Sequence, residues 1–247
     1  MAIRDFTSQR IFLDAPLSPG AEVDCTPEQA SYLRSVMRMD AGSALLVFNG
    51  RDGEWRAVLR HHGKRHATVE IEAQTRAQDV SADLWYVFAP LKRSRLDYMV
   101  QKAIEMGASR LVPVLTQHTV AERVNLDRMR ANVIEAAEQC GILSIAEVAE
   151  PVKIASLLAT WPSARALVFC DEAATQANPI AALSKVPRGP LAVLIGPEGG
   201  FSEPERQAIA AKPYVHAISL GPRIMRADTA AVAALAVVNA VLGDWGV

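Results

Sequence analysis

The chain has 247 residues, of which 50% are hydrophobic, and its formal net charge is −1. This length suits two domains of ordinary size, and with so little net charge any affinity for nucleic acid has to come from local basic patches. Three scattered cysteines exclude a disulfide framework and a cysteine-based zinc site, so we expect reduced thiols, no metal and a cytosolic location. No apolar run reaches the length of about 18 residues that a membrane span needs, and the N-terminal residues lack the apolar segment of a signal peptide.

Residues 1–74 predict a small β-rich domain. Alternating, β-branched or aromatic residues typical of strands occupy 10–13, 44–48, 54–59 and 67–71. Asn49-Gly50 and Asp52-Gly53 are strong turn signals between two of these segments. One helix is expected, over residues 27–37. We therefore expect a compact barrel, followed by a polar linker over residues 75–83.

From residue 84 to residue 247, predicted strands and helices alternate. Strands are expected as short, mostly apolar runs at 84–89, 110–115, 166–170, 191–195 and 216–220. Helices are expected from Ser94 to Gly107 and over 126–139, 179–183, 203–211 and 229–242. Such alternation predicts an α/β domain with a mainly parallel sheet. Ligands of such sheets bind at the C-terminal ends of the strands.

A glycine-rich loop, IGPEGGF over residues 195–201, directly follows one of these strands. Its glycines and proline allow the backbone to approach a ligand closely and to expose N–H groups. The loop matches neither the phosphate-binding P-loop nor the dinucleotide fingerprint, and no lysine follows it to hold a triphosphate. Ser202 and Glu205 have capping-box spacing for a following helix. A tight strand-to-helix turn without a ligand is the alternative explanation.

A second loop, LGPRIMR over residues 220–226, also follows a predicted strand. It repeats the Gly-Pro pair of the first loop, and Arg223 and Arg226 add positive charge where an RNA phosphate or base would sit. Each loop alone is explained equally well by a plain connection. Two such loops in one sheet favour a shared pocket.

The final predicted helix, over residues 229–242, is apolar nearly all round. A helix with no polar face is normally buried. Burial in the core and burial in a subunit interface both account for this pattern. We favour the interface, and hence a homodimer.

Residues 195–205, IGPEGGFSEPE, and 220–230, LGPRIMRADTA, resemble the two signature segments of the SPOUT-class methyltransferases. They are most similar to the RsmE-type family, which methylates N3 of a uridine in small-subunit (16S) ribosomal RNA. QKAIEMG at 101–107, EAAEQCG at 135–141 and the regions around residues 10–12 and 34–38 resemble further segments of that family. The chain departs from the family pattern at a few positions, namely Cys140, Ile142, Met225 and the pair Ala227-Asp228.

The resemblance implies a C-terminal trefoil-knot (SPOUT) α/β domain over residues 84–247 and a PUA-like, RNA-binding β-barrel over 1–74. It also implies S-adenosyl-L-methionine as cofactor, a homodimer, and 16S ribosomal RNA or the small ribosomal subunit as partner. The residues expected to bind the cofactor lie in the two loops and at the end of the strand before the first: Leu194, Ile195, Gly196, Pro197, Gly199, Leu220, Gly221, Ile224 and Met225.

Two residues of the loops are candidates for catalysis. Uridine N3 is a weakly acidic imide and has to lose a proton before or during attack, which requires a base or stabilisation of the anion. Arg226 is our candidate for stabilising negative charge on the uracil oxygens or positioning a phosphate, and the alternative is a surface arginine beside a helix. Glu198 would act as a base or steer the sulfonium, or else it braces the loop. His118 and His216 are isolated in the sequence, and neither is an obvious candidate.

Five basic residues are expected to bind RNA. Lys92 and Arg95 lie where the first strand of the second domain meets its helix, and the N-terminus of that helix would add to phosphate binding. Lys102 lies further along the same helix, where a salt-bridging surface lysine is the alternative. Arg10 and Arg38 are candidates on resemblance alone.

A basic run over residues 56–66 fits an RNA contact and an ordinary solvated hairpin equally well. Two alternatives for the function as a whole also stay open. One is a SPOUT enzyme that acts on another RNA such as transfer RNA. The other is a noncatalytic RNA-binding assembly factor that keeps the fold. The intact GPEGG loop argues against the second alternative, and binding of S-adenosylmethionine tests it.

Overall fold

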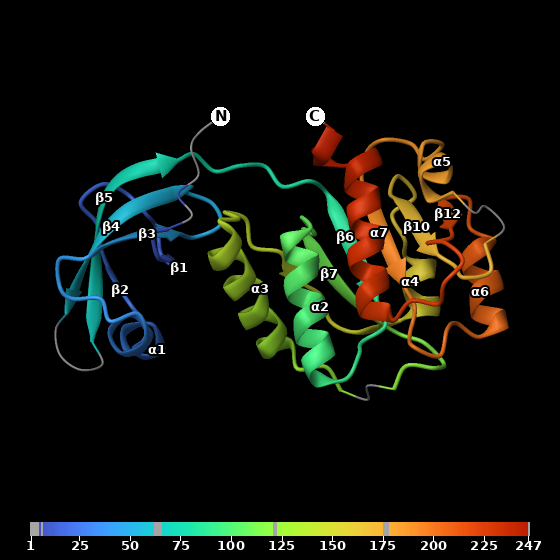
Figure 1. The fold of residues 1–247 in the computed structure, drawn as a ribbon, viewed down its shortest axis with the longest axis horizontal. Helices are drawn as coiled ribbons and strands as arrows, with labels where there is room; N and C mark the ends of the chain where they lie inside the picture. The colour runs from blue at the N-terminus through green and yellow to red at the C-terminus, as the bar shows by residue number, and fades with distance from the viewer. Residues whose placement is uncertain (1–4, 6, 62–65, 121–122, 175–177, 247) are drawn as a thin grey trace. The chain divides into compact units, whose positions relative to one another are not determined.

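The computed structural model of the chain describes residues 5, 7–61, 66–120, 123–174 and 178–246 (Figure 1). Contacts divide the chain into two compact units. The first consists of residues 1–80 and 134–145, and the second of residues 81–133 and 146–247. The first unit therefore takes in a segment from the middle of the C-terminal region, which the sequence pattern did not indicate.

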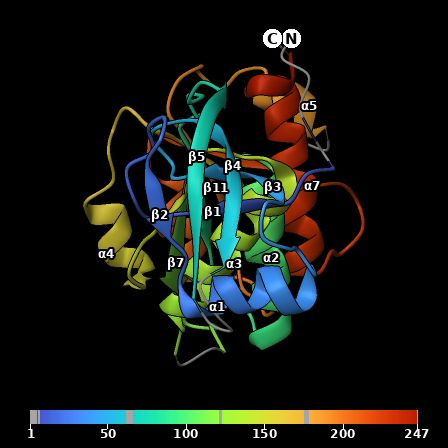
Figure 2. The same ribbon diagram turned by 90° about the vertical axis from the view of Figure 1, so that its left-hand side faces the viewer.

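A five-stranded sheet forms the first unit, in the order β1-β3-β4-β5-β2. Strands β1 and β3 are parallel and the other neighbours are antiparallel; Figure 2 shows β4 and β5 with α1 at one end of the strands. The four strands predicted from the sequence are confirmed, and β2 is an additional one. The bounds are β1 (Arg10–Phe12), β2 (Glu22–Asp24), β3 (Ala44–Phe48), β4 (Glu54–His61) and β5 (Ala67–Arg76).

The helix expected over residues 27–37 is an α-helical turn, α1 (Pro27–Ser31), continued by a π-helical turn, η1 (Tyr32–Val36). It begins at a capping box in which the Thr26 hydroxyl accepts from the Gln29 N–H and the Gln29 side chain accepts from the Thr26 N–H. Apolar side chains from this helix and from the sheet close the core of the unit: Ile11, Leu13, Leu33, Leu45, Val47, Leu59, Val69 and Ile71.

Arg10 lies in the interior of the first unit and is only 5% exposed. Its Nε donates to Glu54 Oε2 at 2.7 Å, and its two terminal nitrogens donate to the backbone carbonyls of Glu138 and Asp5 at 3.3 and 3.0 Å. A buried guanidinium group needs such partners, because its desolvation is otherwise costly. The side chain of Arg10 is thus enclosed by protein, which does not favour the predicted direct contact with RNA.

The segment 134–145 joins the first unit through specific contacts. Glu138 Oε1 accepts from the Phe12 N–H at 2.8 Å, and Ala137 and Leu143 pack against Phe48 in a separate apolar cluster. Burial raises the pKa of the Glu138 carboxyl to about 7. This part of the EAAEQCG segment therefore serves the packing of the N-terminal sheet.

A seven-stranded sheet forms the second unit, and every strand pair in it is parallel. Its order is β12-β10-β11-β6-β7-β8, with β9 paired to β7. After β6, the chain places β7, β8 and β9 on one side of β6. The later strands β10, β11 and β12 lie on the other side, with β11 next to β6. The bounds are β6 (Leu84–Phe88), β7 (Arg110–Leu115), β8 (Glu147–Val148), β9 (Val152–Lys153), β10 (Ala166–Cys170), β11 (Leu191–Ile195) and β12 (Val215–Ile218).

Helices follow these strands as the alternating pattern predicts, and α4 is an additional one that the sequence did not indicate. They are α2 (Arg93–Glu105), α3 (Leu126–Cys140), α4 (Ile154–Ala159), α5 (Pro179–Leu183), α6 (Glu203–Ala210) and α7 (Ala227–Val241), followed by a short 3₁₀ turn, η2 (Asp244–Gly246). None of the helices within the described ranges is long and apolar enough to span a membrane.

The last helix, α7, packs alongside α2 (Figure 1). One side of α7 is buried through Ala231, Ala234, Leu235 and Val238. The buried Asn239 donates from Nδ2 to the Met106 carbonyl at 2.6 Å, which satisfies its polar group at the end of α2. Core burial therefore explains this side of the helix.

Candidate active site

A cavity of about 480 Å³ lies where the segments after β10, β11 and β12 meet. This is the C-terminal edge of three neighbouring parallel strands, the position at which such sheets bind ligands. The volume lies in the range of roughly 300–1,000 Å³ that is common for small-molecule sites. Both loops predicted from the sequence line this cavity, so the inference of a shared pocket is confirmed.

Most of the predicted cofactor residues line the cavity: Ile195, Gly196, Pro197, Leu220, Gly221, Ile224 and Met225. The candidates Glu198 and Arg226 line it as well. Two predicted residues do not. Leu194 is fully buried in the core cluster beneath the sheet, and Gly199 packs on the side of the loop that contacts His118.

The first loop is anchored to the core through Phe201. Its ring packs edge-on against Phe169 of β10, with ring centroids 5.4 Å apart. A Cβ on Gly196 would lie 2.6 Å from this ring, so the loop can close over Phe201 only with glycine at that position. The predicted capping box is present, since the Ser202 N–H donates to Glu205 Oε2 at 3.1 Å. Loop and helix α6 therefore form one fixed connection.

Glu198, at the tip of this loop, forms an ion pair with Arg95 of α2. Both side chains are partly exposed. The structure thus brings together one residue predicted for catalysis and one predicted for RNA binding, and each neutralises the other. This pairing matches the bracing alternative for Glu198.

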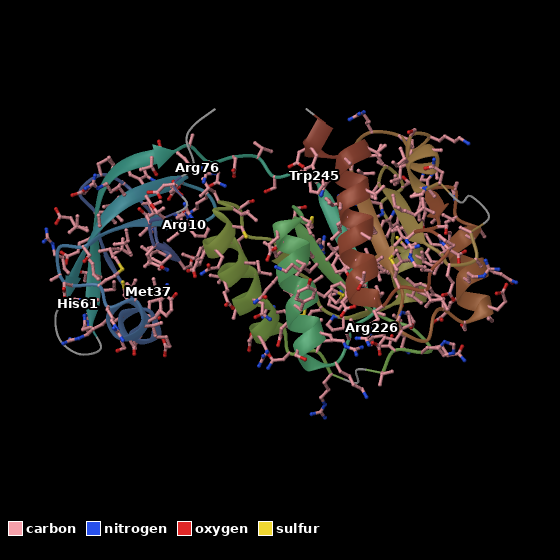
Figure 3. The ribbon with its side chains drawn as sticks, viewed as in Figure 1. Arg10, Met37, His61, Arg76, Arg226 and Trp245 are labelled. Carbon is pink, nitrogen blue, oxygen red and sulfur yellow. The ribbon has the colours of Figure 1, made fainter. Side chains whose placement is uncertain are left out.

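Within the part of the chain that the structure describes, the second loop makes no ion pair and no ring contact like those of the first loop. Ile224 is 94% exposed, and Arg223 and Arg226 are exposed beside it. Among the described residues, no hydrogen-bonding or charged partner of the Arg226 side chain is found. Figure 3 shows Arg226 at the N-terminal end of α7, where its backbone begins the helix. Its guanidinium group therefore stands at the rim of the cavity, available to a ligand.

A third wall of the cavity, formed by the last residue of β10, Cys170, and by residues 171–173 after it, was missed by the sequence reasoning. Asp171 is buried and accepts from Arg206 of α6 at 3.2 Å, and Glu203 pairs with the same guanidinium group. Glu203 and Asp171 together raise the pKa of Arg206 above its ordinary value. An acidic pair immediately after a predicted strand of the same sheet was the signal that would have pointed to this wall.

Two further groups on this wall differ in their chemistry. Burial raises the pKa of the Cys170 thiol to about 12, so this residue stays protonated and is no nucleophile near neutral pH. Glu172 is exposed and lines the cavity, and its Oε1 would lie 3.4 Å from a Cβ placed on Gly200. The wall therefore presents a carboxylate next to the first loop.

The remaining RNA candidates differ in their local surroundings. Lys92 is exposed at the N-terminus of α2. Lys102 bonds both carboxylate oxygens of Glu105 at 2.6 and 2.8 Å and lies over the Tyr98 ring, as the salt-bridge alternative predicts. Arg38 belongs to the first unit, where it is exposed and has a positive φ of 53°.

The basic run over residues 56–66 lies largely on β4. Arg56 pairs with Glu72 and Arg60 pairs with Glu70 across the strand pair, and His61 (Figure 3) contacts the Met39 carbonyl at 3.1 Å. Residues 62–65 lie outside the described residues. The described part fits a solvated hairpin with cross-strand ion pairs.

Comparison with known proteins agrees with this architecture. A family model described as an RNA methyltransferase domain matches residues 78–239, and one described as an RNA methyltransferase PUA domain matches residues 26–72. The Ribosomal RNA small subunit methyltransferase E of Synechocystis sp. is 30% identical, over 90% of this chain and 74% of its own length. The chain belongs to this RNA methyltransferase family.

Solved structures of such methyltransferases superpose on nearly the whole chain. A Ribosomal RNA small subunit methyltransferase E from Neisseria gonorrhoeae, bound to S-adenosyl methionine, is 27% identical with a TM-score of 0.85. A putative methyltransferase from Legionella pneumophila, in complex with the bound cofactor SAM, is 27% identical with a TM-score of 0.84. Each alignment covers 96% of this chain and 99% of the other. The predicted fold, a SPOUT domain with an N-terminal PUA-like domain, and the resemblance to the RsmE-type family are confirmed.

Proposed function

We propose that this chain transfers a methyl group from S-adenosyl-L-methionine to N3 of a specific uridine in 16S ribosomal RNA. The observation that carries the proposal is the cavity walled by IGPEGGF and LGPRIMR at the ends of neighbouring parallel strands. Family members that superpose on 96% of this chain are bound to S-adenosylmethionine. The ribosomal substrate implies a cytoplasmic location.

The residues around the cavity fit this cofactor. Ile195, Leu220 and Met225 offer apolar surface for an adenine ring, and the loop backbones supply polar groups beside it. Asp171 and Glu172 place carboxylates on the third wall, which suits a ligand that carries positive charge or ribose hydroxyls. When bound, S-adenosylmethionine supplies an electrophilic methyl group on its sulfonium.

Arg226 is the group that we assign to the reacting base. Loss of the N3 proton leaves negative charge spread over the uracil ring and its oxygens, and a guanidinium group with unused donors stabilises such charge. Arg226 meets this requirement, because its exposed side chain stands at the cavity rim without a partner among the described residues. Glu198 fits a bracing role better than that of the base, because Arg95 occupies its carboxylate.

RNA binding beyond the reacting base is proposed for Lys92 in the second unit and Arg38 in the first. Both are exposed basic residues, and Arg38 lies in the region matched by the PUA domain. Phosphate and shape recognition suit such exposed cations, because folded RNA displays mainly its backbone. Arg95 and Lys102 would contact RNA only after exchanging their present carboxylate partners.

We also propose that the protein is a homodimer. The side of α7 that is not packed in the core carries apolar residues such as Val232, Val237 and Val241, which are half-buried. Trp245, just beyond this helix, is 57% exposed (Figure 3). An apolar face of this kind is typical of a surface covered by another protein, here a second copy. Light scattering on the purified chain tests this directly, and a monomeric mass at micromolar concentration contradicts it.

The decisive experiment incubates the purified chain and S-adenosylmethionine with 16S ribosomal RNA that lacks 3-methyluridine, both as naked RNA and within the small subunit. Mass spectrometry of nucleosides is expected to find 3-methyluridine in at least one of them and none in transfer RNA. Modification of transfer RNA alone would favour the first alternative. Cofactor binding without any transfer, or no cofactor binding by calorimetry, would favour the noncatalytic one.

A further inference from the structure

The turn that follows β7 lies against the first loop, although the two are far apart in sequence. Thr119 Oγ1 closes this turn by accepting from the Thr116 N–H at 2.9 Å. The Gln117 N–H then donates to Glu205 Oε1 at 2.8 Å, so the turn is attached to the start of α6. This places residue 118 beside the glycines of the loop.

His118 makes the contact of interest. Its Nδ1 lies 3.2 Å from the Gly199 carbonyl oxygen and 3.0 Å from the Gly200 carbonyl oxygen. Because a carbonyl oxygen only accepts, Nδ1 has to carry the proton and donate to this pair. The side chain is exposed to solvent on one side and lies against the loop on the other, since a Cβ on Gly199 would be in ordinary van der Waals contact with His118 Cβ at 3.4 Å.

The contact from His118 restrains the backbone of two glycines. Glycine loses more conformational freedom on ordering than any other residue, so a GPEGG loop is costly to hold in one shape. The Gly200 N–H is already bonded to the Pro197 carbonyl at 2.9 Å, and His118 holds the opposite, carbonyl side. A loop fixed before the ligand arrives binds it more tightly, because ordering does not oppose binding.

We propose that His118 is a positioning residue of the cofactor pocket: its Nδ1–H fastens the Gly199 and Gly200 carbonyls and keeps the GPEGG loop in its binding shape. The sequence offered no reason to select this histidine. The proposal rests on the function proposed above for the pocket. It assigns His118 no contact with the reacting atoms.

The test compares the full-length chain with His118→Ala, His118→Asn and Gln117→Ala. His118→Ala removes the donor and is expected to weaken S-adenosylmethionine binding roughly tenfold by calorimetry. His118→Asn keeps a donor at the δ position and is expected to restore affinity to within about threefold. Gln117→Ala is the matched control, because it leaves the backbone bond to Glu205 intact, and it is expected to bind normally.

Hydrogen exchange of the amides in residues 196–201 gives a readout that does not depend on the cofactor. His118→Ala is expected to accelerate exchange in this loop about tenfold, with the thermal unfolding midpoint unchanged, while Gln117→Ala leaves the loop as in the wild type. Unchanged loop exchange, or equal losses of affinity in the alanine and asparagine variants, overturns the role of His118. If the wild type binds no cofactor but His118→Ala still frees the loop, the proposed function fails and the positioning contact stands.

Discussion

The two glycine-containing loops of the pocket begin alike and are held very differently. Both follow a strand of the same parallel sheet with a Gly-Pro pair. The first loop is fastened by the packing of Phe201 on Phe169 and by the ion pair between Glu198 and Arg95. In the second loop Ile224 is almost fully exposed. The same Gly-Pro pair therefore begins one loop that is held by contacts, the fixed loop, and one loop that is exposed, the open loop.

This difference suggests a division of labour. A loop that is already fixed binds its ligand with little loss of conformational entropy, because it does not have to become ordered on binding. A loop with exposed donors and apolar groups keeps them available for a second ligand. We infer that the first loop serves mainly the cofactor, and that Arg226 in the second serves the RNA base.

The largest expected effect comes from a substitution in the open loop. Arg226→Ala removes the guanidinium group assigned to the uracil anion, and kcat for methyl transfer should fall about 10²–10³-fold, the usual loss for one donor aimed at developing charge. The dissociation constant for S-adenosylmethionine should stay within about threefold. Methyl-transfer assays at saturating substrate measure kcat, and calorimetry measures the dissociation constant.

Arg223→Ala provides the matched control for Arg226, since it removes a neighbouring exposed arginine of the same loop. Its effect on kcat should be much smaller. A large loss of cofactor affinity in Arg226→Ala, with kcat preserved, would move this residue from the RNA base to the cofactor and would remove the proposed division between the loops.

The second prediction concerns a substitution that disturbs the packing of the fixed loop. Gly196→Ala introduces a methyl group 2.6 Å from the Phe201 ring, which then has to leave its contact with Phe169. Overpacking of this kind costs about 1–3 kcal/mol, so cofactor affinity should fall roughly 5- to 150-fold. Calorimetry measures the loss, and the thermal unfolding midpoint should fall with it.

A second substitution decides whether this clash is the cause. Phe201→Leu makes room for the added methyl group, so the double variant Gly196→Ala/Phe201→Leu should bind better than the sum of the two single losses predicts. Strict additivity would mean that Gly196 matters for direct contact with the cofactor and not for the closure of the loop over Phe201.

The sequence predicted the strands and both loops of this pocket because their signals are local. A short apolar run followed by glycine and proline marks a strand end wherever the rest of the chain lies. Arg10 shows where prediction from local sequence signals fails. Its burial depends on Glu54 and on the carbonyl of Glu138, 128 positions further along the chain. No local pattern distinguishes such an arginine from one that binds RNA.

The third wall of the pocket was missed although its acidic pair directly follows a predicted strand, because a strand end alone does not show which other loops lie beside it. Asp171 becomes a pocket residue through its pairing with Arg206 of α6, a contact made across the sheet edge. The role of His118 likewise depends on β7 lying two strands away from β11. Where the function of a residue comes from strand order, the sequence supplies the residue but not its neighbours.

The smallest expected effect tests the open loop from its apolar side. Ile224 is 94% exposed, so Ile224→Ser should leave the thermal unfolding midpoint unchanged, because the folded protein gains little from this side chain. If Ile224 closes over the adenine once the cofactor is bound, the same variant should lose about three- to tenfold in affinity through the apolar surface that is no longer buried. Ile180→Ser is the matched control, an exposed isoleucine on α5 that does not line the cavity, and it should change neither quantity. A lower midpoint for Ile224→Ser would show that the second loop is held by packing after all, and unchanged affinity would show that its apolar side does not meet the cofactor.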